Sequence, residues 1–205
     1  MTNADSVFAK CAWRLIPFIM LLYLINYLDR VNAGFAALTM NTELGFTPSV
    51  FGFGAGMFLL GYALFQVPAN AILTRLGARL WMSAILFVWG LLSAACAFVS
   101  DPLHFITARF FLGIAEAGFF PGIIYYLTLW FPPASRARFI AVFMSAAPLS
   151  FILGGPLSSF VLEMNGMSGL SGWQWLFLLE GLPASILAFA VLAMLPDGPQ
   201  TAPWL

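Results

Sequence analysis

YLINYLDRVNAGF, residues 23–35, places Asp29 and Arg30 side by side in the middle of an otherwise apolar run. The whole chain has only eight basic and eight acidic residues in 205. Charged side chains are rarely buried unless they are paired, because removing them from water is costly. Two neighbouring charges inside an apolar segment therefore need an explanation, and the rest of the sequence supplies one.

The composition around this stretch is that of a membrane protein. Hydrophobic residues make up 62% of the chain and charged residues 8%, against about 45–50% and about 25% in soluble domains. The formal net charge is zero, and the basic residues form no stripe of the kind that binds nucleic acid. We therefore expect the lipid bilayer, and no nucleic acid, among the partners. The first apolar stretch is also longer than the core of a cleavable signal peptide.

Six segments are long and apolar enough to cross a bilayer as helices, which takes about 20 residues each. They lie at residues 14–38, 49–73, 80–99, 103–130, 139–162 and 173–195. Turn and charge signals separate them, such as NTELGFTP after the first and FPPASRAR after the fourth. The runs are too long for membrane β-strands and lack their alternation of apolar and polar residues. The sequence predicts an all-α membrane protein, with residues 1–205 forming one bundle of six transmembrane helices.

The basic residues outside the apolar segments predict the orientation of the chain. Lysine and arginine in short loops are retained on the cytoplasmic side. Six of the eight basic residues lie at the start of the first span or in the second and fourth loops, and the first, third and fifth loops have none. We expect a multi-pass protein of the cell membrane, the inner or plasma membrane, with both termini in the cytoplasm.

Four charged residues lie well inside the predicted spans, namely Asp29, Arg30, Arg109 and Glu116. Each costs about 2.5–3.5 kcal/mol at the centre of a bilayer. Arg109 and Glu116 are two helical turns apart and share a helix face, whereas Asp29 and Arg30 point about 100° apart. We expect the four to form a cluster of the first and fourth spans around a central cavity. Such a cluster either locks two helices together or marks a substrate or ion pathway, which we favour.

The chemistry of this cluster indicates a mechanism. Arginine stays cationic and presents a planar fork that matches a carboxylate, and a carboxylate removed from water takes up a proton more readily. Ionised acids would mask the arginines, and protonated acids would expose them to an organic anion. This predicts a secondary active transporter that carries a small organic anion into the cytoplasm by symport with protons. An organic-anion exchanger and a non-transporting assembly subunit are the alternatives.

An enzyme is the third class of function, and the sequence argues against it. No nucleophile with an adjacent base, no metal-ligand set and no phosphate-binding loop is recognisable. We expect neither a metal nor a cofactor.

Other polar side chains occur at a similar depth in the spans. Asn26, Tyr27 and Tyr62 could hydrogen-bond a substrate, or could instead join helices to one another. Glu180 lies about two turns inside the last span, where we expect its side chain to reach the membrane surface or to cap a loop.

With these residues in view, the chain resembles the amino-terminal half of a major facilitator superfamily transporter, most closely the anion:cation symporter branch. The resemblance covers nearly the whole chain and rests on NYLDRVNAGFA, PANAILTRLGARLWM, ARFFLGIAEAGFFPG, LWFPPASRAR and GWQWLFLLEGLP, in this order. The proton-coupling carboxylates that it implies are Asp29 and Glu116. The substrate-binding residues that it implies are Arg30 and Arg109, with Tyr27 and Tyr62 as further pocket residues. Sugar acids, dicarboxylates and aromatic acids are all substrates that such a branch would accept.

The second loop matches the gating loop of the superfamily only in part. Arg75, Gly77 and Arg79 agree with its pattern. Asn70 stands where a glycine is usual, and Thr74 stands where an aspartate is usual. The resemblance thus leaves the ion pair of this loop in doubt.

The resemblance also implies that half of the protein is absent. Transporters of this family have twelve helices, and each six-helix half contains a three-plus-three inverted repeat. The carboxy-terminal half would be missing here, since the chain ends with LPDGPQTAPWL, which is similar to the start of a central cytoplasmic loop. A fragment is the interpretation we favour; a truncated gene product and two assembling halves are the others. The expected partners are this second half, the organic anion and protons.

Overall fold

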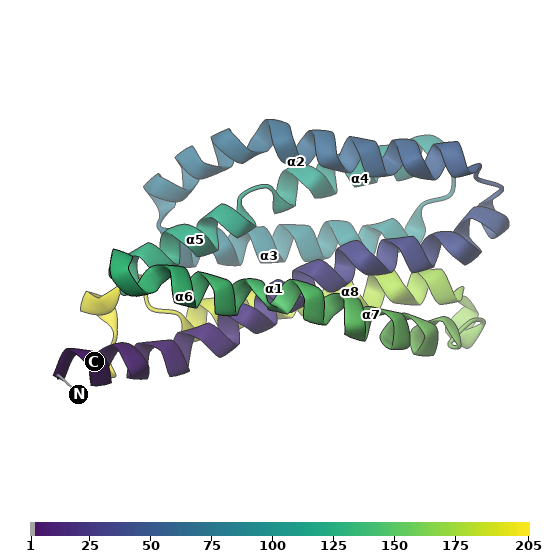
Figure 1. Ribbon diagram of the computed structural model, residues 1–205. Helices are drawn as coiled ribbons and strands as arrows, with labels where there is room; N and C mark the ends of the chain where they lie inside the picture. Colours follow the sequence, from purple (N-terminus) through teal and green to yellow (C-terminus); the bar gives the residue numbers. More distant parts are fainter. Residues whose placement is uncertain (1–2) are drawn as a thin grey trace.

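The computed structural model describes residues 3–205, and the regular structure within them is helical throughout (Figure 1). The α-helices are α1 (Asn3–Leu44), α2 (Pro48–Leu76), α3 (Ala78–Ala95), α4 (Pro102–Glu116), α5 (Phe119–Trp130), α6 (Pro133–Met144), α7 (Ala146–Leu162) and α8 (Gly172–Met194). The short 3-10 helices are η1 (Cys96–Phe98), η2 (Met167–Gly169) and η3 (Pro199–Thr201). Within the described residues, six stretches are long and apolar enough to cross a membrane. The predicted fold class, an all-α bundle of six spans, is confirmed.

The first helix extends well beyond the predicted span 14–38. Its 42 residues correspond to a length of about 63 Å, roughly twice the hydrocarbon thickness of a bilayer, about 30 Å. A helix keeps its backbone hydrogen bonds outside the hydrocarbon as well as inside, so polar residues at its ends do not terminate it. The first and last residues of a helix are therefore not the limits of the part that crosses the membrane. The limits of the six membrane-spanning segments remain predictions.

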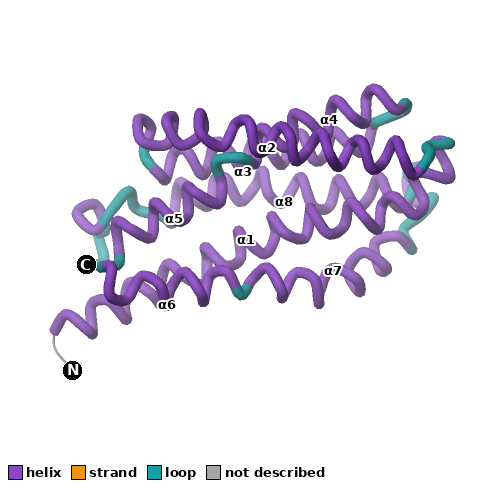
Figure 2. Tube along the Cα trace, turned by 45° about the horizontal axis from the view of Figure 1, so that its top comes forward, coloured by secondary structure: helices purple, strands orange, loops and turns teal. Residues whose placement is uncertain are grey.

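Two of the predicted spans are interrupted, which corrects the expectation of one continuous helix each. Residues 103–130 form α4 and α5, separated at 117–118, and residues 139–162 form the end of α6 and α7, separated at Ser145 (Figure 2). Pro121 and Pro148 each lie three residues after a break and contribute to it. Proline has no N–H, so the carbonyls four residues earlier, those of Ala117 and Met144, lose their helical donors. One consequence is that Glu116 becomes the last residue of α4.

The helices pack in pairs that bring distant segments together. α3 packs against α8, α2 against α4, and α1 against both α7 and α8. The α2–α4 pair is especially close, since a Cβ atom on Gly113 would lie 2.1 Å from the carbonyl oxygen of Phe58. In Figure 1, α2 and α4 lie at the top of the view with α3 below them, α6 and α7 lie lower, and α1 crosses from the lower left to the right-hand end of α2.

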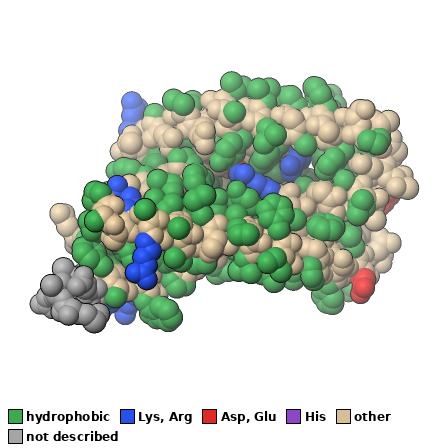
Figure 3. Space-filling model, viewed as in Figure 1, with side chains coloured by type: hydrophobic (Ala, Val, Ile, Leu, Met, Phe, Trp, Pro, Cys, Tyr) green, Lys and Arg blue, Asp and Glu red, His purple; other side chains and the backbone are tan. Residues whose placement is uncertain are grey.

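Charge is distributed unevenly along the bundle. The start of α1 and the C-terminus of the chain lie at the same end (Figure 1). Figure 3 shows basic side chains near that end and midway along the visible face, and acidic side chains at the opposite end. The predicted orientation, with both termini in the cytoplasm, rests on this asymmetry.

Candidate functional site

An ion pair joins α1 to the end of α4 in the interior of the bundle. Arg30 Nη2 lies 2.8 Å from Glu116 Oε2, and Arg30 Nε donates to the same oxygen at 2.9 Å. Asn26 Nδ2, one turn earlier on α1, donates to it as well, at 2.9 Å. The Glu116 side chain is completely buried, whereas 26% of the Arg30 side chain is exposed. The other carboxyl oxygen, Oε1, is buried without a hydrogen-bond partner among the described residues.

Aromatic rings surround the guanidinium group of Arg30. Its central carbon lies 4.8 Å from the ring centroid of Tyr62, 5.4 Å from that of Phe58 and 5.5 Å from that of Tyr27. The central guanidinium carbon of Arg109 lies 4.7 Å from the centroid of the same Phe58 ring. Each contact is within the range of cation–π attraction. Sequence reasoning missed Phe58, although its position one turn before Tyr62 on α2 was a usable signal.

A cavity of about 170 Å³ opens beside this ion pair. Its walls are formed by Tyr23, Asn26, Tyr27, Arg30, Tyr62, Phe120 and Met144. Four of these residues, those at 26, 27, 30 and 62, were predicted to bind substrate, and the structure brings them together. A larger groove, of about 640 Å³, lies between α1 and α6, but its lining is mainly apolar and excludes the ion pair. Converging polar groups distinguish the smaller cavity as the candidate site.

Asp29 does not share this cavity, so the predicted cluster of four charges forms only in part. Its carboxylate accepts hydrogen bonds from Trp89 Nε1, at 3.1 Å, and from the Ser93 hydroxyl, both on α3. Neighbouring residues on a helix point about 100° apart. Arg30 therefore faces α4, and Asp29 faces α3 on another side of α1. Among the described residues neither Asp29 nor the buried Arg109 has an ion-pair partner within 4.0 Å.

Glu180 also departs from the prediction, which placed its side chain at the membrane surface or on a loop. Instead, Asn32 Nδ2 of α1 donates to Glu180 Oε1. The prediction was wrong because α8 packs directly against α1.

The second loop is a single-residue turn at Gly77 between α2 and α3. Gly77 has a φ of +82°, in the region that favours glycine, and its N–H donates to the carbonyl of Leu73 at 3.0 Å. Thr74 cannot replace the usual aspartate, since its hydroxyl donates to its own helix, at the carbonyl of Ala71. Arg75 lies exposed in the last turn of α2.

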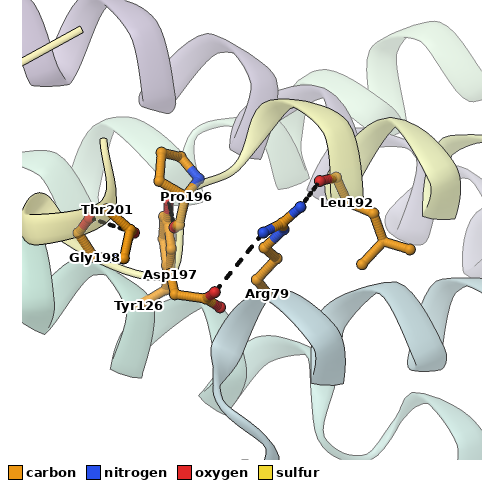
Figure 4. A network of polar contacts seen from close by, with 7 residues as sticks. All are labelled: Arg79, Tyr126, Leu192, Pro196, Asp197, Gly198 and Thr201. Carbon is orange, nitrogen blue, oxygen red and sulfur yellow. Dashed lines mark hydrogen bonds and ion pairs between the residues drawn. The ribbon is translucent and has the colours of Figure 1, made fainter. Parts of the chain in front are cut away.

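Arg79, the other basic residue of this loop, finds its acidic partner elsewhere in the chain. Its Nη1 lies 3.8 Å from Asp197 Oδ2, and its Nη2 donates to the carbonyl of Leu192 at the end of α8 (Figure 4). This ion pair joins the start of α3 to the segment after α8, and the gating pair of the superfamily pattern stays in doubt.

Long apolar helices that enclose a buried arginine–glutamate pair beside a small polar cavity are the architecture of a membrane transport protein. The comparisons with known proteins agree. Residues 19–204 match the Major Facilitator Superfamily, and the chain belongs to this family.

Relatives in the family have transport in their names. The chain is 56% identical over 199 residues to an Agrobacterium vitis protein named "Putative tartrate transporter", covering 97% of this chain and 44% of that protein. It is 43% identical to "Inner membrane transport protein RhmT" of Escherichia coli K12, covering 98% of this chain and 47% of that protein. The chain thus spans about half the length of the curated relatives it matches.

A solved structure shows the same fold. It is a bacterial homologue of the human lysosomal transporter Spinster, in an inward-facing and occupied conformation. The TM-score is 0.83 at 20% sequence identity, and the match covers 90% of this chain and 44% of that one.

Proposed function

We propose that this chain forms the amino-terminal half of a secondary active transporter that carries a small organic anion into the cytoplasm together with protons. The observation that supports it most directly is the Arg30–Glu116 pair, in which a permanent cation beside a cavity is masked by a group that a proton can neutralise. Arginine remains charged at any physiological pH, so only the carboxylate can change its state.

The proposed cycle is a competition for Arg30. While Glu116 is ionised, its Oε2 accepts from both Nε and Nη2 of Arg30, and an anion must displace it. When Glu116 binds a proton, its attraction for Arg30 falls, and the guanidinium fork becomes available to the carboxylate of a substrate. Loss of the proton toward the more alkaline cytoplasm restores the competition and releases the anion.

The other predicted residues have supporting roles in this proposal. Asn26, Tyr27 and Tyr62 would hydrogen-bond the anion from the walls of the cavity. Arg109 would supply a second cation near Phe58, and Asp29 a second proton-binding carboxylate. Residues 75, 77 and 79 would belong to the loop that gates access from the cytoplasm.

Further observations support the substrate class, the missing second half and the location. Tartrate, in the name of the Agrobacterium vitis relative, is a dicarboxylate, and two neighbouring arginines match two carboxylates in charge. The cavity, about 170 Å³, is smaller than typical ligand sites, about 300–1,000 Å³, as expected if a second six-helix half completes it. The name of the Escherichia coli relative includes the inner membrane, and the distribution of basic residues favours cytoplasmic termini.

The test is Glu116→Gln in a transporter that joins this chain to its second half, reconstituted in vesicles. Glutamine has the shape of a protonated glutamate but cannot lose a proton. We expect tartrate binding to lose most of its dependence on pH, concentrative uptake driven by a proton gradient to be lost, and exchange of internal for external tartrate to persist.

Glu163→Gln, which changes an exposed acid in the loop after α7, is the matched control and should leave all three activities unchanged. Concentrative, pH-dependent uptake by the Glu116→Gln protein would contradict the proposal. If the unsubstituted transporter requires internal anion and moves no protons, it is an exchanger, and the symport mechanism is wrong.

A further inference from the structure

Glu180 places a further carboxyl group inside the bundle, against Asn32 of α1 and outside the cavity beside Arg30. Its Oε1 meets Asn32 of α1, and its Oε2 is buried without a hydrogen-bond partner among the described residues. Burying an ionised carboxylate without a counter-charge costs several kcal/mol, and a neutral acid avoids most of this cost.

The ionisable groups near Glu180 offer it no cation. On α1 the nearby group is Asp29, an acid. α3 has one ionisable residue, Arg79, which is engaged at the far end of the helix by Asp197. α7 has none, and η1 contributes only the thiol of Cys96.

The two buried acids differ in what stabilises them. Asp29 accepts hydrogen bonds from Trp89 and Ser93. Glu180 has no comparable pair of donors, and two ionised carboxylates at close quarters would repel each other. Glu180 is thus the buried acid whose surroundings do least to stabilise a negative charge.

The hydrogen bonds beyond Asn32 indicate the same state. The Ser158 hydroxyl oxygen lies 2.6 Å from Asn32 Oδ1 and also 2.6 Å from the carbonyl oxygen of Gly154. A hydroxyl has only one proton, so it cannot donate to both. The oxygen and nitrogen ends of an asparagine amide have nearly the same shape, so the Asn32 amide fits this site in either orientation.

Each orientation belongs to one protonation state of Glu180. With Glu180 ionised, Asn32 Nδ2 donates to Glu180 Oε1, and Ser158 donates to Asn32 Oδ1. With Glu180 protonated on Oε1, its O–H donates to Asn32 Oδ1, Asn32 Nδ2 donates to Ser158 Oγ, and Ser158 donates to the carbonyl of Gly154. Both arrangements use every donor, but only the second lets Ser158 donate to the neighbouring carbonyl of Gly154 and leaves no net charge on Glu180.

We propose that Glu180 is a proton-binding site, and that the Asn32 amide turns over when this site is occupied. One proton then sets the direction of every hydrogen bond in a chain that crosses from α8 through α1 to α7. Because α1 also carries Arg30, this site lies on the helix that forms the cavity, yet among the described residues none of the side-chain hydrogen bonds of the site reaches a residue of the cavity wall. The inference rests on the geometry of the three helices and stands whether or not the protein carries anions.

Infrared spectroscopy of the purified chain in detergent micelles tests this site, since unionised carboxyl groups give a C=O band that shifts in heavy water. At neutral pH we expect such a band, lost in Glu180→Gln and retained in the control Glu163→Gln. Ser158→Ala should leave the band in place but shift its frequency, because the chain loses the group that accepts from Asn32.

A band that survives Glu180→Gln unchanged would overturn the proton site. A band unmoved by Ser158→Ala would overturn the turnover of the amide. Should Glu180→Gln not yield folded protein, the Ser158→Ala spectrum decides alone, because only a protonated acid connected to Ser158 would respond to the loss of its hydroxyl.

Discussion

Phe58 has no polar side-chain atom, yet its ring contacts both arginines of the site. Both guanidinium groups lie within 5.4 Å of its ring centroid. The negative face of the ring partly offsets the repulsion between them. Arg109 has no ion-pair partner within 4.0 Å among the described residues, so its contact with this ring is a restraint that the charges around it do not supply.

Replacing the ring should therefore weaken anion binding without removing any charge. For Phe58→Leu in the complete transporter, we expect the dissociation constant for tartrate to rise about 5- to 30-fold, corresponding to about 1–2 kcal/mol of lost cation–π attraction. Isothermal titration at fixed pH measures it. Phe53→Leu, which alters an exposed ring on the same helix, is the control. Equal affinities for the two variants would show that the ring does not position the arginines.

At the scale of the helices, the sequence predicted the bundle well because length and apolarity alone decide whether a segment can cross a bilayer. It predicted Arg30, Asn26, Tyr27 and Tyr62 near one cavity, since these residues share a depth. It could not predict which neighbouring helix the side chain of Asp29 faces. That direction depends on which helix packs against each side of α1, and no local pattern encodes that arrangement.

The close approach of α4 to α2 is a second property of the helices that decides the site, because it sets where Phe58 lies relative to Arg109. In Gly113→Ala the new Cβ would lie 2.1 Å from the Phe58 carbonyl oxygen, so the helices must separate. We expect the free energy of unfolding to fall by about 1–3 kcal/mol. Thermal unfolding in detergent measures this loss.

Gly52→Ala provides the comparison on α2, since a Cβ there meets nothing within 4 Å. Its stability should stay the same or rise by up to about 1 kcal/mol, because alanine restricts the unfolded chain. If both variants unfold at the same temperature, the α2–α4 contact is looser than the structure shows.

At the scale of the whole molecule, the segment after α8, residues 195–205, joins helices that are otherwise far apart in the sequence. Tyr126 of α5 donates to the carbonyl of Pro196 at 2.9 Å (Figure 4). The ring of Trp204 stacks on Trp130 with centroids 5.5 Å apart. From α1, Lys10 donates to the carbonyl of Trp204, and the guanidinium of Arg14 lies 5.2 Å from its ring centroid.

Trp204 should therefore restrain the first turns of α1. Cys11 is buried and lies in the sequence between the two basic residues that contact Trp204, so its reactivity can report on the opening of these turns. In Trp204→Ala we expect the free energy of local opening to fall by about 1 kcal/mol, which raises the rate of Cys11 alkylation about fivefold. Cys96, in η1, should react at its original rate. Trp13→Ala removes a tryptophan that is 83% exposed on α1 and should change neither rate. Unchanged alkylation of Cys11 in Trp204→Ala would mean that α1 is held by its helix contacts alone, because the terminal segment would then rest on the bundle without restraining it.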